Sequence, residues 1–491
     1  MTKSLSQILS DGTLVDNTQH RAIQGVFQSG WRQEKVEIRQ GRNANHPGAA
    51  WPLLQSAANL QIDPASIVLR SPQADYEHNT DDPLIVLSGF DPLNFSLTTG
   101  NLVGSIKSEG HTLRISSRFG DEFLRYIIAD ADGFAEIPEQ GGIAKGGYEW
   151  LLNYFWLIQL KKAFRLGLPK SYETRKESLT QVRGRMDPID CHLNQSRARF
   201  ACTYREHSYE NPATQLIART LEHLDARSGL HGLHALKQTF QTATGGRRHP
   251  LQTLLAAPPI RNPYYADYNP VLDLAKRILK GDLADVGHHD QASALLFDVS
   301  MLFEYFIRKL LRKADMQLHD KTTSRWFISP GIPYARRALI PDLVFDHEGR
   351  TFVFDVKYKN FHFGGRSPGV NREDIFQLHT YVGQATNHYD VGGCGLIYPI
   401  RESQWHNQNL AATGGILTSK IRQGGREIPF HVAFVMLPER GEISESEWVQ
   451  VFQERFRASL AVFLNGFELA LNRRFDPHEE SPLALRPTKW Q

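Results

Sequence analysis

Cysteine is scarce in this sequence of 491 residues, which contains only Cys191, Cys202 and Cys394. No CxxC pair and no cysteine–histidine cluster with the spacing of zinc ligands occurs. The scarcity and the spacing therefore indicate neither a disulfide framework nor a structural zinc site.

Long apolar runs are also missing. The N-terminal stretch MTKSLSQILSDG has no apolar core of the kind found in signal peptides. The most apolar window, residues 148–160, is interrupted by Glu149, Asn153 and Gln159, and it therefore predicts a core helix and not a membrane span. We expect a cytoplasmic protein with no membrane association.

Neither sign of charge is in large excess. The sequence contains 56 Lys and Arg residues and 53 Asp and Glu residues, which gives a formal net charge of +3. Such a mild balance does not by itself indicate nucleic-acid binding, so a basic DNA-binding groove has to be a local feature. The apolar fraction of 41% and the charged fraction of 22% are those of an ordinary globular protein.

The pattern along the chain predicts three regions in a multidomain α/β protein. Residues 1–140 contain short strand-like runs such as LIVLSGF and LVGSIKS between Gly, Asn, Asp and Pro, and they predict a β-rich domain. Residues 141–287 predict a mainly helical region with one strand pair, formed by GRMDPIDCHL and RARFACTYREHS. Residues 288–491 predict a mixed sheet flanked by helices.

In this last region, the sequence from residue 291 predicts a helix whose apolar stripe includes Leu295, Val299 and Phe303. The elements predicted after it are strands at 338–345 and 351–358, a helix at 372–385, strands at 394–400 and 430–437, and a helix at 446–471.

The stretch TFVFDVKYK places Asp355 and Lys357 inside an otherwise apolar strand. A charge that is buried without a partner costs several kcal/mol, about as much as a large part of a domain's stability. Two charged residues in such a strand therefore need a structural or chemical reason.

A hairpin supplies a reason if DHEG, residues 346–349, is a four-residue turn. Asp342 then opposes Val353, and opposed residues share a face of the sheet. Asp342, Asp355 and Lys357 would lie on that face, with both carboxylates able to converge on one ion. A three-residue turn would put Asp342 on the wrong face. The opposite face, assigned to the core, holds Phe352, Phe354, Val356 and Tyr358.

Two carboxylates beside an ammonium suit metal-assisted hydrolysis of a phosphodiester. Mg²⁺ is bound by carboxylates, waters and phosphate oxygens, and it lowers the pKa of a bound water. We expect Asp342 and Asp355 to bind Mg²⁺, with Mn²⁺ able to substitute, and Lys357 to position the water or to neutralise the transition state. The alternative is a salt-bridged, solvent-facing edge strand.

Glu304, in FEYFIRKLL, is a candidate third carboxylate that acts on the metal through its waters. The equally weighted alternative is a surface glutamate that pairs with Arg308 one helical turn later.

The segment EDIFQLHTYVGQ places Asp374, Gln377 (or Leu378) and Tyr381 on one helical face. Gln377 is a candidate for orienting the attacking water or a phosphate. The alternative for Asp374 is a structural position in the first turn of a helix that begins at Asn371.

The Pro341-Asp342 and Asp355-Val356-Lys357 motifs, with a helix before them and Gln377 after, resemble the PD-(D/E)xK nuclease superfamily. Stretches such as NLVGSIKSEGHTLRISSRFG, YEWLLNYFWLIQLKKAFRLG and LLFDVSMLFEYF are similar to McrC-family proteins, especially the LlaJI-type branch. The resemblance covers about residues 96–225 and 291–400.

This resemblance implies a nuclease subunit of an McrBC-like restriction system, which docks through its N-terminal region onto a hexameric McrB-type AAA+ GTPase. The partner recognises DNA and hydrolyses GTP, and the McrC subunit stimulates that hydrolysis and cuts double-stranded DNA. The lack of a GxxxxGK[ST] motif fits a chain that does not itself bind GTP. Carried over by motif position, Asp342, Asp355 and Lys357 are the catalytic set, and Glu304 and Gln377 are further members.

Two other functions remain open. Much of the chain lies outside the nuclease region, so it could be a non-catalytic adaptor that activates a ring NTPase and keeps a silent nuclease fold. It could also be a stand-alone repair nuclease specific for a DNA structure. One site per chain favours the pairing of two nuclease domains if both DNA strands are cut.

Overall fold

The computed structural model describes residues 2–30, 35–39, 50–59, 67–69, 85–108, 111–131, 149–193, 199–228, 233–280, 293–321, 326–328, 337–364 and 369–472. The chain forms two compact units. Unit 1 consists of Met1–Gly104, His111–Ala135 and Leu296–Gln491, and unit 2 consists of Ser105–Gly110 and Glu136–Leu295. Within the described ranges, no helix has the length and apolarity needed to cross a membrane. The division into three domains at residues 140 and 287 stays a prediction.

The N-terminal part is rich in strands, as the sequence predicts. Its elements are β1 (Thr2–Lys3), α1 (Leu5–Ser10), β2 (Leu14–Val15), β3 (Gln19–Ile23), β4 (Val26–Ser29), β5 (Lys35–Ile38), α2 (Ala50–Asn59), β6 (Ile67–Leu69), β7 (Ile85–Asp91), β8 (Asn94–Thr99), β9 (Leu102–Ser108), β10 (His111–Ser116) and α3 (Asp121–Ala131). One sheet has the order β1-β5-β4-β3-β8-β7, and a second has the order β2-β10-β9-β14-β6, with β14 at Ser293–Asp298. Alternate side chains of β3 and β4 are buried, with the period of two expected for a half-buried strand.

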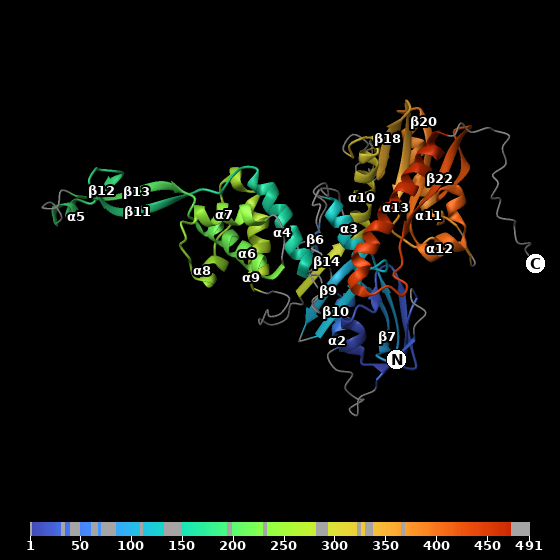
Figure 1. Cartoon of the computed structure of the whole chain (residues 1–491), viewed down its shortest axis with the longest axis horizontal. Helices are drawn as coiled ribbons and strands as arrows, with labels where there is room; N and C mark the ends of the chain where they lie inside the picture. Colours follow the sequence, from blue (N-terminus) through green and yellow to red (C-terminus); the bar gives the residue numbers. More distant parts are fainter. Residues whose placement is uncertain are drawn as a thin grey trace, which may run out of the picture. The chain divides into compact units, whose positions relative to one another are not determined.

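The helices of unit 2 are α4 (Glu149–Phe164), α5 (Pro188–Leu193), α6 (Pro212–Ser228), α7 (Leu233–Ala243), α8 (Leu251–Leu255), the 3₁₀ helix Pro263–Tyr265 and α9 (Tyr268–Lys280). Its strands β11 (Ser171–Leu179), β12 (Arg185–Met186) and β13 (Phe200–Ser208) form an antiparallel ribbon. Figure 1 shows this ribbon extending from the helices α4 and α6–α9, with α5 near its far end.

The strand pair predicted in unit 2 is only partly correct. In GRMDPIDCHL, just Arg185 and Met186 pair with β13, and the rest forms α5. Proline suits the first position of a helix, and the Oδ1 atom of Asp187 accepts a hydrogen bond from the Ile189 N–H at 3.1 Å. The long partner of β13 is β11, which the sequence interpretation missed.

The C-terminal part of unit 1 is built on a mixed sheet of order β15-β18-β19-β20-β22-β21. We call it the C-terminal sheet. The elements of this part are α10 (Val299–Lys313), β15 (Gln317–Leu318), β16 (Trp326–Ile328), β17 (Arg337–Leu339), β18 (Leu343–His347), β19 (Arg350–Val356), α11 (Arg372–Ala385), β20 (Val391–Arg401), α12 (Glu402–Asn407), the 3₁₀ helix Leu410–Thr413, β21 (Ile416–Gln423), β22 (Arg426–Leu437) and α13 (Glu445–Asn472). The predicted mixed sheet with flanking helices is confirmed.

Two predicted elements of this part begin or end elsewhere. The helix predicted from residue 291 is instead strand β14 followed by α10, because the Asp298 side chain accepts hydrogen bonds from the Ser300 and Met301 N–H groups and so caps the helix. The strand predicted at 338–345 is divided into β17 and β18 on either side of Pro341, which has no N–H for strand pairing. Strand β21 was not predicted.

The hairpin of β18 and β19 has a shorter turn than predicted. Val344 pairs with Val353 and His347 with Arg350, so Glu348 and Gly349 alone form the turn. Both have positive φ, 47° and 77°, as a two-residue type I′ turn requires. The predicted register, based on a four-residue turn, was therefore wrong by two residues. A shift of two keeps every side chain on its predicted face.

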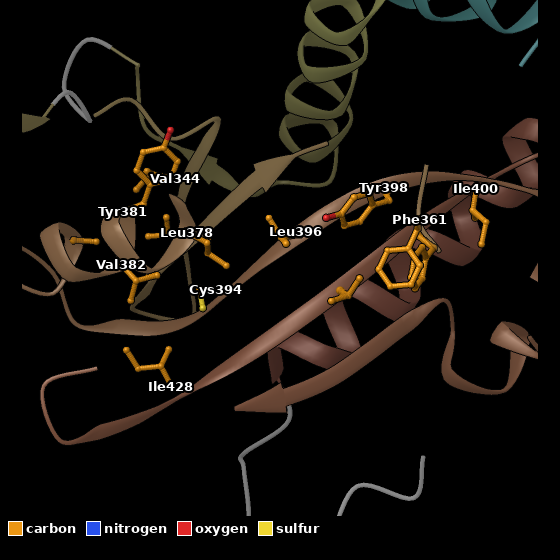
Figure 2. Packing of buried hydrophobic residues seen from close by; sticks show 14 of the residues in the cluster. Val344, Phe361, Leu378, Tyr381, Val382, Cys394, Leu396, Tyr398, Ile400 and Ile428 are labelled. Atoms are coloured by element: carbon orange, nitrogen blue, oxygen red, sulfur yellow. The ribbon is translucent and has the colours of Figure 1, made fainter. Parts of the chain in front are cut away.

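Both faces of this hairpin are buried, whereas the sequence interpretation assigned the core to one. Phe345 and Phe354 pack against Phe467 of α13, with ring centroids 6.1 and 5.0 Å apart. On the other face, Val344 and Val353 belong to a cluster with residues of α11. Figure 2 shows Leu378, Tyr381 and Val382 of α11 gathered near Val344 and Cys394. Each buried phenylalanine contributes about 1.5–3 kcal/mol to stability.

A buried polar cluster connects the N-terminal strands to the end of β19. Asn17 Nδ2 donates to the carbonyl oxygen of Tyr358 at 3.1 Å, and the Arg118 N–H donates to Asp16 at 2.6 Å. The Arg118 guanidinium lies over the Tyr358 ring, 4.7 Å from its centroid. Burial raises the pKa of Asp16, although Arg118 and a hydrogen bond with the Tyr358 hydroxyl oppose that rise.

Candidate functional site

The hairpin brings Asp342 and Asp355 together at one end of the C-terminal sheet. Leu343 pairs with Phe354, so the register continues to Asp342 opposite Asp355. The Oδ2 atom of Asp342 accepts a hydrogen bond from the Val356 N–H at 2.9 Å, which fixes this carboxylate against β19. The two aspartates therefore lie on the same face of the sheet, as the sequence predicts.

Asp355 is 1% exposed, and β19 is hydrogen-bonded to β18 on one side and to β20 on the other. These facts exclude the alternative of a solvent-facing edge strand. Burial, and secondarily the charge of Asp342, raises the pKa of Asp355 well above its usual value, although Lys357 opposes the rise. The Lys357 ammonium forms an ion pair with the Oδ2 atom of Asp355.

Lys357 is held by groups from two elements. Besides its ion pair with Asp355, its Nζ atom donates to Gln377 Oε1 of α11 at 2.6 Å. Gln377 Nε2 in turn donates to the Tyr381 hydroxyl at 2.8 Å. Burial lowers the pKa of Lys357, but the surrounding carboxylates outweigh this effect and raise it, so the ammonium stays charged. Leu378, the alternative to Gln377, points into the core.

Glu304 reaches the same region from α10. It forms an ion pair with Lys321, and the Lys321 ammonium also lies 3.7 Å from Asp342. Burial, followed by the charge of Asp342, raises the pKa of Glu304 to about 7. Glu304 does not form the alternative ion pair with Arg308, because the Arg308 guanidinium donates hydrogen bonds to the backbone carbonyls of Asp342 and His319.

Lys321 was not predicted from the sequence. Asp374, predicted as either a site residue or a residue of the first helical turn, has more contacts at the site than either prediction implied. Asp374 is buried and accepts hydrogen bonds from Lys359 Nζ at 2.7 Å and from the Tyr398 hydroxyl at 3.2 Å. It also lies 3.7 Å from Lys357. Helix α11 is capped by Asn371, which accepts from the Glu373 N–H at 3.2 Å. The spacing of Lys357 and Lys359 was a usable signal, since residues two apart share a strand face.

The donor set at this end of the sheet suits a hard divalent cation. Asp342 and Asp355 offer carboxylate oxygens, and a cation between them would relieve the repulsion that raises the pKa of Asp355. In the described ranges, no group of three or more His, Cys, Asp or Glu side chains is arranged to hold a metal. In this arrangement the ammonium groups of Lys321 and Lys357 balance the carboxylates.

Comparison with known proteins matches one family model and six chains of solved structures, two of which follow. The model of a family described as McrBC 5-methylcytosine restriction system component matches residues 97–399, more than half of the chain. No curated protein sequence matches it.

The first structure is a refined half-complex from a tetradecameric assembly of Thermococcus gammatolerans McrB AAA+ hexamers with bound McrC. It is 15% identical, with a TM-score of 0.46, and the match covers 94% of this chain and 99% of that chain. The second is the Thermococcus gammatolerans McrBC complex, which is 14% identical, with a TM-score of 0.30, and the match covers 66% of this chain and 90% of that chain.

Proposed function

We propose a function from the premise that the chain belongs to the McrBC 5-methylcytosine restriction system component family. The protein is the Mg²⁺-dependent DNA endonuclease subunit of a GTP-driven restriction complex. Family membership confirms the resemblance at the level of the McrBC system. The assignment to McrC, and to its LlaJI-type branch, is part of the proposal.

The observation that carries the proposal is the convergence of Asp342, Asp355 and Lys357 at one end of a mixed sheet between α10 and α11. A hairpin followed by a helix and a parallel strand, with these residues in these places, supports a PD-(D/E)xK nuclease fold. Gln377 completes the set through its hydrogen bond to Lys357.

The side chains have distinct parts in the proposed reaction. Asp342 and Asp355 would hold Mg²⁺, with Glu304 as a further carboxylate beside them, and the bound ion would supply charge stabilisation and an acidified water. Lys357 is charged and held from two sides, so it presents an ammonium to the phosphate as negative charge develops there. Gln377 keeps Lys357 in this orientation through its hydrogen bond.

The partner in this proposal is a hexameric AAA+ GTPase, which binds GTP and selects the DNA. Two observations support this division of labour. The family is described as a component of a restriction system, and the sequence has no GxxxxGK[ST] motif. Cleavage of both strands of double-stranded DNA then requires two nuclease domains to act together, since the described residues of one chain form one such site.

The test is DNA cleavage and GTP hydrolysis by this chain reconstituted with an McrB-type AAA+ GTPase. Lys357→Ala is expected to reduce cleavage by roughly 10²–10³-fold, the usual loss for one charge-stabilising donor. Asp355→Asn is expected to reduce it at least as much. Both variants should stimulate the GTPase as the natural chain does.

Glu427→Gln is the matched control, because Glu427 is an exposed carboxylate that pairs with Lys420 and Arg422 on the outer strands of the same sheet. If the Asp355→Asn complex still cleaves DNA, the nuclease assignment is wrong, and the chain is instead a non-catalytic adaptor that activates a ring NTPase. Full cleavage by the isolated chain without any nucleotide would instead identify a stand-alone nuclease.

A further inference from the structure

Lys321 is a second buried lysine at the site, and the catalytic motif does not include it. It follows β15, and its side chain is 14% exposed. Its ammonium pairs with Glu304 and lies 3.7 Å from Asp342. Lys321 thus lies beside Glu304 and Asp342, and Lys357 forms an ion pair with Asp355, the third carboxylate of the site.

We propose that Lys321 is an internal counter-ion that competes with the divalent metal for Glu304 and Asp342. The inference rests on the proposed metal-dependent nuclease function and adds a residue that sets how tightly the metal binds.

Charge and geometry support this role. The Lys321 ammonium contacts Glu304 directly and lies near Asp342, and both are predicted metal ligands. It therefore occupies the region to which their charges would attract a metal ion. A divalent ion that approaches these carboxylates meets a like charge at short range, in a buried place where screening is weak. Without the ammonium, Glu304 and Asp342 would repel each other, and a metal would relieve that repulsion. For both reasons, replacing Lys321 with a neutral residue is expected to strengthen metal binding.

Lys357 differs from Lys321 in its partners. Gln377, a neutral residue of α11, accepts a hydrogen bond from Lys357, so this lysine keeps a partner when the carboxylates bind a metal. The partners of Lys321 that the structure gives are both candidate metal ligands, Glu304 and Asp342. Metal binding therefore separates Lys321 from its ion pairs, whereas Lys357 retains a hydrogen bond.

The experiment measures Mn²⁺ binding to the full chain by calorimetry, without DNA or partner. Lys321→Gln is expected to lower the Kd for Mn²⁺ on the order of tenfold, which corresponds to one modest charge–charge interaction. Lys321→Arg keeps the charge and is expected to bind within about threefold of the natural chain, a difference of less than 1 kcal/mol. Lys420→Gln, which removes a half-buried lysine paired with Glu427 away from the site, controls for the loss of a positive charge.

An unchanged or higher Kd in Lys321→Gln would overturn the inference and leave Lys321 a structural residue. Should that variant fold poorly, the same comparison is made between Glu304→Gln and Glu304→Gln with Lys321→Gln, in which no carboxylate at 304 is left facing a missing ammonium. A lower Kd in the double variant is expected there, and an equal Kd would refute the competition.

The proposed function fails separately. If the natural chain and Asp355→Asn bind Mn²⁺ with the same Kd, then the metal site itself is wrong, whatever Lys321 does.

Discussion

The buried histidine His431 makes the stability of the C-terminal sheet depend on pH. His431, in β22, is 2% exposed, its ring stacks on Phe354 with centroids 6.1 Å apart, and its Nδ1 atom lies 3.1 Å from the Thr418 hydroxyl. Burial lowers its pKa from 6.5 to about 4. Between these values the unfolded chain binds the proton and the folded chain does not. Its contribution to stability is therefore complete above pH 6.5 and is lost as the pH falls toward 4.

We expect this residue to remove about 3 kcal/mol from the free energy of unfolding between pH 6.5 and pH 4. His431→Gln should be less stable at neutral pH and should lose less stability on acidification. Urea denaturation of both proteins over this pH range is the measurement. Parallel loss in the two would show that other groups cause the acid sensitivity. The buried carboxylates of Asp355 and Glu304, with raised pKa values, act in the opposite direction.

Sequence reasoning found some site residues and missed others for a physical reason. Asp342, Asp355 and Lys357 were placed together because side chains alternate along a strand, so parity alone assigns the face. The same alternation made Lys359 foreseeable. Lys321 lies beside Glu304 only because the chain after α10 turns back along β18, and no periodicity in the sequence encodes that path.

At the scale of elements, the start of α10 determines where Glu304 lies. Asp298 caps the helix through hydrogen bonds from Ser300 N–H at 2.9 Å and Met301 N–H at 3.2 Å. Asp298→Ala leaves both groups without this partner and is expected to lower the free energy of unfolding by about 1 kcal/mol. Asp298→Asn retains an acceptor and should cost only a few tenths of a kcal/mol, or about the experimental error. Urea denaturation tests both, and equal losses would mean that the carboxylate charge, not the cap, matters.

The hairpin shows how much of an element its local sequence encodes. The strands of DLVFDHEGRTFVFDV were predicted from their β-branched and aromatic residues, but the turn was taken as four residues. The Asn-Gly or Asp-Gly pair that marks a two-residue turn is absent, and Glu348 adopts a φ of 47°, which is unusual for glutamate. Packing on both faces fixes this register, and the sequence around the turn carries little sign of it.

At the scale of the whole molecule, the cluster around Tyr358 joins the N-terminal strands of unit 1 to the strand that carries Asp355. The Tyr358 hydroxyl lies 3.4 Å from Ser117 Oγ and shares a hydrogen bond with buried Asp16. Tyr358→Phe keeps the ring packing but takes away this partner. We expect it to lower the free energy of unfolding by about 1–3 kcal/mol, the usual cost of an unsatisfied buried group.

Tyr172→Phe is the control for this prediction, because Tyr172 is 63% exposed and should change stability by less than about 0.5 kcal/mol. Thermal unfolding of the three proteins gives the comparison. A Tyr358→Phe variant as stable as the natural chain would show that ring packing alone makes the connection.

The division of unit 1 into separated segments has a consequence for synthesis on the ribosome. Residues 1–104 and 111–135 leave the ribosome long before residue 296, with most of unit 2 made in between. At about 5–20 residues per second, this interval lasts roughly 8–30 s. During that time Phe123 lacks the aromatic neighbours that later cover it, Phe303 and Phe456. The packing around Phe123 is therefore completed only after α10 and α13 have been made.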